Sequence, residues 1–301
     1  MKKIEYRNKE LLCDEYLQIF SEYLSKMQKE WESIREKIDG FYLFPEKIED
    51  ILIARFEDLA NMYSDYISME ISYENINNIT KIFKYKGYWQ TKISEFYRFH
   101  SEEMGINTCC YCETAYINIY KKGNGKKSHF DLDHFFPKAN CPILSLSFYN
   151  LVPSCPICNE RLKKNDILGD DSKEWLLLSP TSDNYAFDDA VKIHVLPKQR
   201  TYNCMRYQDN PEKFFIHFDT SMENYEKEIE MFHLNERYDF HICEALRLLD
   251  LLQNYPDTYI HTISTIINRS EESIKEDIFH QDFILHNDRV FAKLYRDLLR
   301  Y

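Results

Sequence analysis

Two Cys-x-x-Cys pairs frame the part of the sequence that is richest in chemically active residues. They are Cys109 with Cys112 and Cys155 with Cys158. Four thiolates in two such pairs form the ligand set of a tetrahedral structural zinc ion, because this spacing lets both sulfurs of one turn reach the same ion. Cys110 lies inside the first pair but lacks the spacing. The pattern predicts a zinc site in preference to chance cysteines or to a redox dithiol.

An acid–base pair and two asparagines lie within or next to this frame. Asp133 directly precedes His134, Asn150 follows sixteen residues after that histidine, and Asn159 directly follows the last cysteine. Imidazole titrates near neutral pH and can accept a proton from water. Carboxylate and amide oxygens are hard ligands that suit Mg²⁺ or Mn²⁺. These residue types are the ones that metal-assisted hydrolysis requires.

The segment between the cysteine pairs is predicted to form a strand, a loop, a strand and a helix, in that order. Alternation of polar and apolar residues over 129–133 places Asp131 on the same face of a strand as Asp133. A second short strand or turn is expected at 150–153, and a helix is expected to begin at Cys158. This order corresponds to a ββα-metal arrangement with the acid–base pair on the first strand.

In these residues the sequence resembles the HNH endonucleases, in their zinc-clamped form, over about 57 of its 301 residues. His134 matches the first motif histidine and Asn150 the central asparagine, while Asn159 stands where the family carries either His or Asn. Asp133 also stands where the family has an Asp before the catalytic His. The resemblance implies that the chain hydrolyses phosphodiester bonds of nucleic acid with a catalytic metal ion.

The resemblance also implies a role for each motif residue. His134 would take the proton from the attacking water, and Asp133 and Asn159 would bind Mg²⁺ or Mn²⁺. Asn150 is expected to brace the loop that orients His134. Asp131 either orients a metal-bound water or has no role. Three lysines are candidates for phosphate contacts, with solvated surface positions as the alternative: Lys138, Lys163 and Lys164. Cys141 is interpreted as structural.

Beyond the motif, the architecture resembles the HNH effectors of Septu-type anti-phage systems, also found with retrons, in which an ABC-type ATPase holds the nuclease. This implies an ATPase partner subunit, and a substrate that is either DNA or a structured RNA such as tRNA. A different class of function remains open, namely a non-catalytic zinc-binding module that interacts with nucleic acid or protein. A thiol redox sensor would require exposed thiolates of low pKa at the first cysteine pair.

The flanks are predicted to be mainly helical. Apolar residues over 9–39 follow an a/d pattern, which indicates one long helix that either packs in a bundle or self-associates as a coiled coil. Further helices are expected over 45–70, 75–103 with a break near Gly87, and from 223 onward. His100 is expected on a helix surface. Two strands are predicted at 191–195 and 214–218, and residues 175–178 are expected to be extended.

The predicted fold is therefore mainly α, a helical scaffold around a zinc-clamped ββα-metal module with a small β insertion in the C-terminal region. The corresponding regions are 1–105, 106–170 and 171–301. The formal net charge is −12, yet residues 108–170 carry eight Lys or Arg against six Asp or Glu, a net charge of +2. An acidic scaffold around a mildly basic centre suggests docking to another subunit. No signal peptide or apolar span is evident, so a cytoplasmic location is expected.

Overall fold

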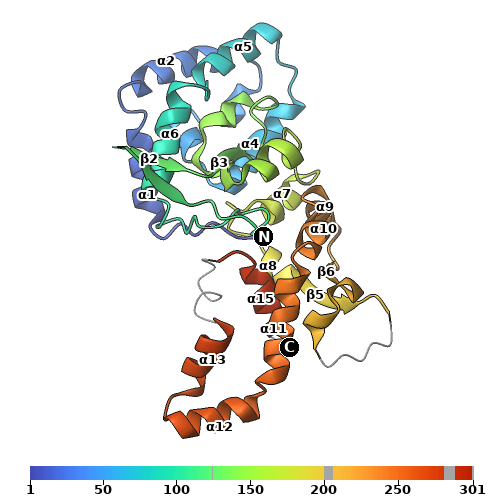
Figure 1. Cartoon of the computed structure of the whole chain (residues 1–301). Helices are drawn as coiled ribbons and strands as arrows, with labels where there is room; N and C mark the ends of the chain where they lie inside the picture. The colour runs from blue at the N-terminus through green and yellow to red at the C-terminus, as the bar shows by residue number, and fades with distance from the viewer. Residues whose placement is uncertain (124, 200–205, 281–288, 300–301) are drawn as a thin grey trace. The chain divides into compact units, whose positions relative to one another are not determined.

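The computed structural model describes residues 1–123, 125–199, 206–280 and 289–299 (Figure 1). The chain is mainly helical, with three two-stranded antiparallel sheets among these residues. It divides into two compact units. The larger unit comprises residues 3–111 and 117–186, and the smaller unit comprises residues 1–2, 112–116 and 187–301.

The larger unit is built from seven helices and two β-ladders. Its helices are α1 (Lys9–Gln18), α2 (Leu24–Arg35), α3 (Ile48–Leu52), α4 (Phe56–Ser68), α5 (Tyr73–Ile82), α6 (Tyr88–Phe99) and α7 (Ser172–Leu178). Its strands are β1 (Ile119–Lys122), β2 (Gly125–Ser128), β3 (Asp131–His134) and β4 (Leu151–Ser154), and a π-helix covers Ile157–Lys163. Figure 1 shows β3 in the middle of this unit, with α4, α6 and α7 around it.

Aromatic side chains join the N-terminal helices to the residues around β3 and β4. The Phe136 ring stacks on Phe56 and Tyr63 of α4, at interplanar angles of 13° and 20°. The Phe148 ring packs against Tyr16 of α1, with 4.9 Å between ring centroids, and against Phe96 of α6. These fully or mostly buried rings supply much of the core. Most of the predicted regions 1–105 and 106–170, namely residues 3–111 and 117–170, accordingly belong to one compact unit.

The prediction of a single helix over 9–39 is wrong. Residues Ile19 to Tyr23 form a tight turn whose backbone N–H groups bond three residues back, as from Ile19 to Tyr16, so the chain leaves α1 and starts again as α2. The a/d residues Phe20, Met27 and Trp31 are buried inside the unit. The apolar seam is thus used for internal packing, which removes the basis for self-association through this segment.

Residues 175–178 are helical, and the predicted extended conformation is wrong. Helix α7 begins after Asp171, whose carboxylate accepts hydrogen bonds from the backbone N–H groups of Lys173 and Glu174 at 2.9 and 3.0 Å. Such a side chain satisfies donors that the first turn leaves unpaired. Trp175 and Leu178 are then one turn apart and are both buried.

The smaller unit contains the two C-terminal strands that the sequence predicted, with helices around them. Strands β5 (Val191–Pro197) and β6 (Phe214–Thr220) pair in the register Val191 to Thr220. Its helices are α8 (Phe187–Ala190), α9 (Glu223–Met231), α10 (Leu234–Asp239), α11 (Ile242–Asn254), α12 (Asp257–Ile267), α13 (Glu271–Phe279) and α15 (Ala292–Leu299). None of the described helices is long and apolar enough to cross a membrane.

Helical side chains pair with the free edges of the β5–β6 sheet. Asp297 Oδ2 accepts a hydrogen bond from the backbone N–H of Ile193 at 2.9 Å. On the other strand, Asn235 Oδ1 accepts from Phe218 N at 2.8 Å and Asp239 Oδ1 from Ile216 N at 3.0 Å. These bonds satisfy edge donors that a two-stranded sheet would otherwise leave unpaired.

Candidate functional site

The predicted strand–loop–strand–helix order is present, with boundaries shifted by one or two residues. Strand β3 pairs with β4 so that His134 faces Leu151 and Asp133 faces Val152 across the ladder. The π-helix Ile157–Lys163 follows β4 after two residues. Since side chains alternate along a strand, Asp131 and Asp133 project from the same face of β3.

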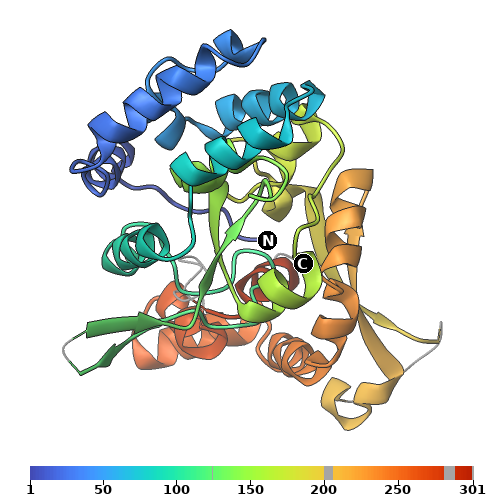
Figure 2. The ribbon, with the colours of Figure 1, turned by 90° about the horizontal axis from the view of Figure 1, so that it is seen from above.

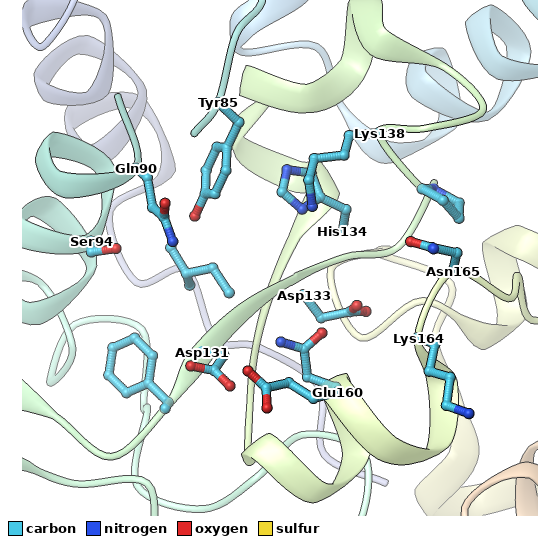
Figure 3. A pocket seen from close by; sticks show the side chains of 14 residues that line it. Tyr85, Gln90, Ser94, Asp131, Asp133, His134, Lys138, Glu160, Lys164 and Asn165 are labelled. Carbon is cyan, nitrogen blue, oxygen red and sulfur yellow. The ribbon is translucent and has the colours of Figure 1, made fainter. Parts of the chain in front are cut away.

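A cavity of about 210 Å³ lies beside β3 and the π-helix (Figure 3). Its polar lining comprises Tyr85, Gln90, Ser94, Asp131, Asp133, His134, Lys138, Asn159, Glu160, Lys164 and Asn165. Figure 3 shows Asp131 and Glu160 close together on one side of this cavity, and His134 with Lys138 on another. The structure therefore gathers five predicted site residues around one space, namely Asp133, His134, Lys138, Asn159 and Lys164.

The imidazole of His134 is held in one tautomer. Its Nε2 lies 3.0 Å from the backbone carbonyl oxygen of Ser145. A carbonyl oxygen only accepts, so Nε2 carries the proton and Nδ1 is the acceptor nitrogen of the neutral ring. Burial, followed by the charge of Lys138, lowers the pKa of His134 to about 3. The ring of Tyr85 meets the imidazole edge to face, with centroids 4.6 Å apart. His134 is thus a neutral, oriented base.

The carboxylate of Asp133 is buried and already has two partners. Its Oδ2 accepts a hydrogen bond from the Tyr111 hydroxyl at 2.7 Å and lies 3.1 Å from Lys163 Nζ. Burial raises the pKa of Asp133, while Lys163 and the Tyr111 hydrogen bond lower it. Lys163 Nζ also donates to the backbone oxygen of His134 at 2.9 Å. The lysine therefore fastens the π-helix to the end of β3.

Lys163 is not available for the phosphate contact predicted for it, because its side chain is fully buried in this ion pair. Lys138 and Lys164 are exposed residues at the cavity, as a phosphate contact requires. The interpretation of His100 as a surface residue is also wrong. Its ring is buried and lies 2.8 Å from Glu15 and 2.9 Å from Glu103.

Asp131 and Asn159 meet across the gap between β3 and the π-helix. Burial raises the pKa of Asp131, and a hydrogen bond from the Asn159 side chain lowers it. The other carboxylate oxygen, Oδ2, is buried and has no hydrogen-bond partner among the described residues. An orphaned carboxylate oxygen is costly unless something neutralises it. A hard divalent cation fits this donor set of carboxylate and amide oxygens.

Asn150 is fully buried, and its side chain forms hydrogen bonds with the loop after β3. Its Oδ1 accepts from Phe136 N at 2.8 Å, and its Nδ2 donates to Phe136 O at 3.1 Å and to Leu144 O at 2.9 Å. Ser145, whose carbonyl oxygen orients His134, directly follows Leu144. Asn150 thus holds the loop that sets the imidazole tautomer.

The sulfur atoms of Cys109, Cys112, Cys155 and Cys158 all lie within 4.8 Å of one another, and all four residues are buried. Tetrahedral zinc with bonds of about 2.3 Å needs sulfurs roughly 3.8 Å apart, so this cluster can bind a metal ion such as zinc. The backbone N–H of Cys155 donates to Cys109 Sγ at 3.3 Å, and the Thr114 hydroxyl donates to Cys112 Sγ at 3.2 Å. Such donors stabilise thiolates.

Some residues of the site could not be identified from local sequence. Tyr85, Gln90 and Ser94 lie more than 35 residues before β3, and only the fold brings them to the cavity. The antiparallel pair β1–β2 was also missed. A signal for it existed, because the dipeptide Gly123-Asn124 between two short polar runs is a hairpin sequence.

Comparison with known proteins gives one partial similarity. The chain is 32% identical over 81 residues to the Septu protein PtuB of Bacillus thuringiensis. The matched stretch is 27% of this chain and 27% of that relative, so the chain spans about a quarter of the length of the curated protein it matches. No protein-family model matches the sequence. No solved structure matches it either. The similarity to a Septu protein is thus distant and partial.

Proposed function

We propose that this chain is a metal-dependent endonuclease of the HNH type, which hydrolyses phosphodiester bonds in DNA or in a structured RNA such as tRNA. The observation that carries the proposal is the cavity in which an oriented, neutral His134 lies near the orphaned Asp131 oxygen and the Asn159 side chain. A base, hard oxygen ligands and exposed lysines are what phosphodiester hydrolysis requires.

The geometry supports a role for each residue. His134 would accept the proton of the attacking water at Nδ1, because Nε2 is occupied by Ser145 O. Tyr111 and Lys163 already bind the carboxylate of Asp133, so we assign to Asp131 the metal-binding role that was predicted for Asp133. Asp131 and Asn159 would hold Mg²⁺ or Mn²⁺, with Asp133 beside them. That ion would supply charge neutralisation for the phosphate and the leaving 3′ oxygen.

The remaining polar residues position this machinery. Lys163 neutralises Asp133 and fixes the π-helix against β3, and Asn150 holds the loop that ends at Ser145. Lys138 and Lys164 line the cavity and would contact phosphates of the substrate. The cysteine cluster, filled by zinc, would fasten the segment before β3 to the start of the π-helix.

The biological context of the proposal rests on the similarity to the Septu protein PtuB. We propose that the chain is the nuclease of an anti-phage defence complex and works with an ABC-type ATPase. The acidic remainder of the chain would then be the docking surface. A non-catalytic zinc-binding interaction module remains the alternative, and it predicts no cleavage under any condition.

The test is cleavage of supercoiled plasmid DNA and of total tRNA by the purified protein, with Mg²⁺, with Mn²⁺ and with neither ion added. Zinc content is measured on the same samples. The proposal predicts cleavage of one of the two polymers only when a divalent ion is added, with about one zinc per chain. Absence of cleavage with either ion, both alone and with the product of the neighbouring gene, would contradict it.

A further inference from the structure

The hairpin formed by β1 and β2 carries four exposed lysines on eight residues. They are Lys121, Lys122, Lys126 and Lys127. No Asp or Glu occurs anywhere from Thr114 to Phe130, so the arm is cationic over its whole length. This concentration of charge contrasts with the net charge of −12 for the chain.

The register of the hairpin places like charges directly opposite each other. Lys121 pairs with Lys126 across the ladder, and Lys127 pairs with Tyr120. Directly opposed like charges destabilise an antiparallel pair, and a two-stranded ribbon is only marginally stable by itself. Single lysines are enough to protect an exposed edge from aggregation. The opposed pair therefore leaves positive charge that a bound anion would neutralise.

The lysine side chains have no acidic partner within the described part of the chain. None of them takes part in an ion pair or side-chain hydrogen bond there. Lys126 makes a cation–π contact instead, with its Nζ 5.7 Å from the centroid of the Phe99 ring. Phe99 is 71% exposed and Tyr120 is 40% exposed. Exposed aromatic rings beside cations are typical of surfaces that bind polynucleotides.

The arm continues directly into the strand that carries the site. Only two residues, His129 and Phe130, separate the end of β2 from Asp131, where β3 begins. In Figure 2 the two strands extend outward from the helices of the larger unit. The five residue steps from Lys126 to Asp131 would span roughly 16 Å at full extension, which sets an upper limit of about five nucleotides along one strand of a duplex.

We propose that the β1–β2 hairpin binds the phosphodiester backbone of a polynucleotide on one side of the phosphate that is cleaved at the cavity. The inference rests on the proposed nuclease function and adds the surface that holds the flanking substrate. The hairpin recognises phosphates and not bases, because lysine is a point charge on a flexible stem.

The experiment measures binding, not cleavage, by fluorescence anisotropy of a labelled 30-base-pair DNA duplex and of labelled tRNA without Mg²⁺ or Mn²⁺. The variant carries Lys→Gln at positions 121, 122, 126 and 127. Its affinity for the preferred probe should fall at least tenfold at about 0.1 M salt. The slope of log affinity against log salt should become shallower by roughly 3 to 4, since each phosphate contact contributes about 0.9.

A matched control removes the same charge elsewhere in the larger unit. It carries Lys→Gln at four exposed positions on or near α2 and α5, namely Lys26, Lys29, Lys37 and Lys81. Its affinity should stay within about twofold of wild type. Lys→Arg at the four hairpin positions, which keeps the charge, should restore binding and the salt slope.

Two results would overturn the inference in distinguishable ways. If wild type binds and cleaves a polynucleotide but the hairpin and control variants bind it equally well, the hairpin assignment fails alone. If wild type binds neither probe, or prefers poly-L-glutamate as a competitor, the proposed function and the hairpin assignment fail together.

Discussion

At the scale of single residues, the site depends on side chains that act through the backbone of one loop. His134 is oriented by the carbonyl oxygen of Ser145, and the loop that presents this oxygen is bound on both sides by Asn150. A histidine that lost this acceptor would rotate or change tautomer. In the proposed nuclease, the asparagine would therefore support the chemistry without lying at the reacting atoms.

Replacement of Asn150 by Ala should lower the free energy of unfolding by about 3 kcal/mol or more, because it leaves buried groups of Phe136 and Leu144 without partners. The midpoint of urea denaturation measures this loss. Asn75→Ala on α5 is the control and should change stability by less than about 0.5 kcal/mol. Equal midpoints for the two variants would show that the loop does not depend on Asn150.

At the scale of elements, short segments are held by single side chains at their ends. Helix α7 has only seven residues, too few for a helix to persist without tertiary packing and caps. Its first turn is capped by Asp171, and Trp175 packs edge-on against Phe136, with ring centroids 5.4 Å apart. The helix therefore supports Phe136, which follows strand β3.

Asp171→Ala should lower the free energy of unfolding by about 1 kcal/mol, the usual cost of a lost N-cap. A lower midpoint of urea denaturation would measure this loss. Asp171→Asn should keep nearly all the stability, since asparagine caps as well as aspartate does. If the alanine and asparagine variants unfold at the same urea concentration, the cap is not what sets this end of the helix.

The sequence predicted correctly those elements that a local residue pattern specifies. It failed where a residue's environment depends on a contact with a residue that is distant in sequence. The cysteine spacing correctly predicted that the four sulfurs gather in one cluster, and the alternating residues correctly predicted strands β3, β5 and β6. The break between α1 and α2 was missed because the tight turn at 19–23 leaves the a/d spacing intact. Lys163 looked like a surface lysine because its partner Asp133 is thirty residues away. Local sequence does not report such long-range pairing.

At the scale of the whole molecule, two compact units and a cluster of four buried cysteines organise the chain. The cysteine cluster joins segments that are more than 40 residues apart in sequence, and it flanks both the strand and the π-helix that line the cavity. If zinc binds there, its binding free energy would add to the stability of the fold. The rest of the chain is an acidic scaffold with a small cationic arm.

Cys155→Ser should abolish stoichiometric zinc and lower the thermal unfolding midpoint, because three thiolates cannot complete the tetrahedral site. Cys110→Ser is the control, since Cys110 is buried in the same segment but lies outside the cluster. It should retain about one zinc per chain by elemental analysis. Loss of zinc in the control, or retention in Cys155→Ser, would require a different ligand set.

The central claim is that His134 is the base of a metal-dependent nuclease, and single-turnover cleavage of the preferred polymer by His134→Ala tests it most directly. The control is His261→Ala on the exposed surface of α12, and zinc content is measured for both. Our account predicts a rate at least 10²-fold below wild type for His134→Ala, with zinc retained and with the control unchanged. Cleavage at the wild-type rate by His134→Ala would contradict the account.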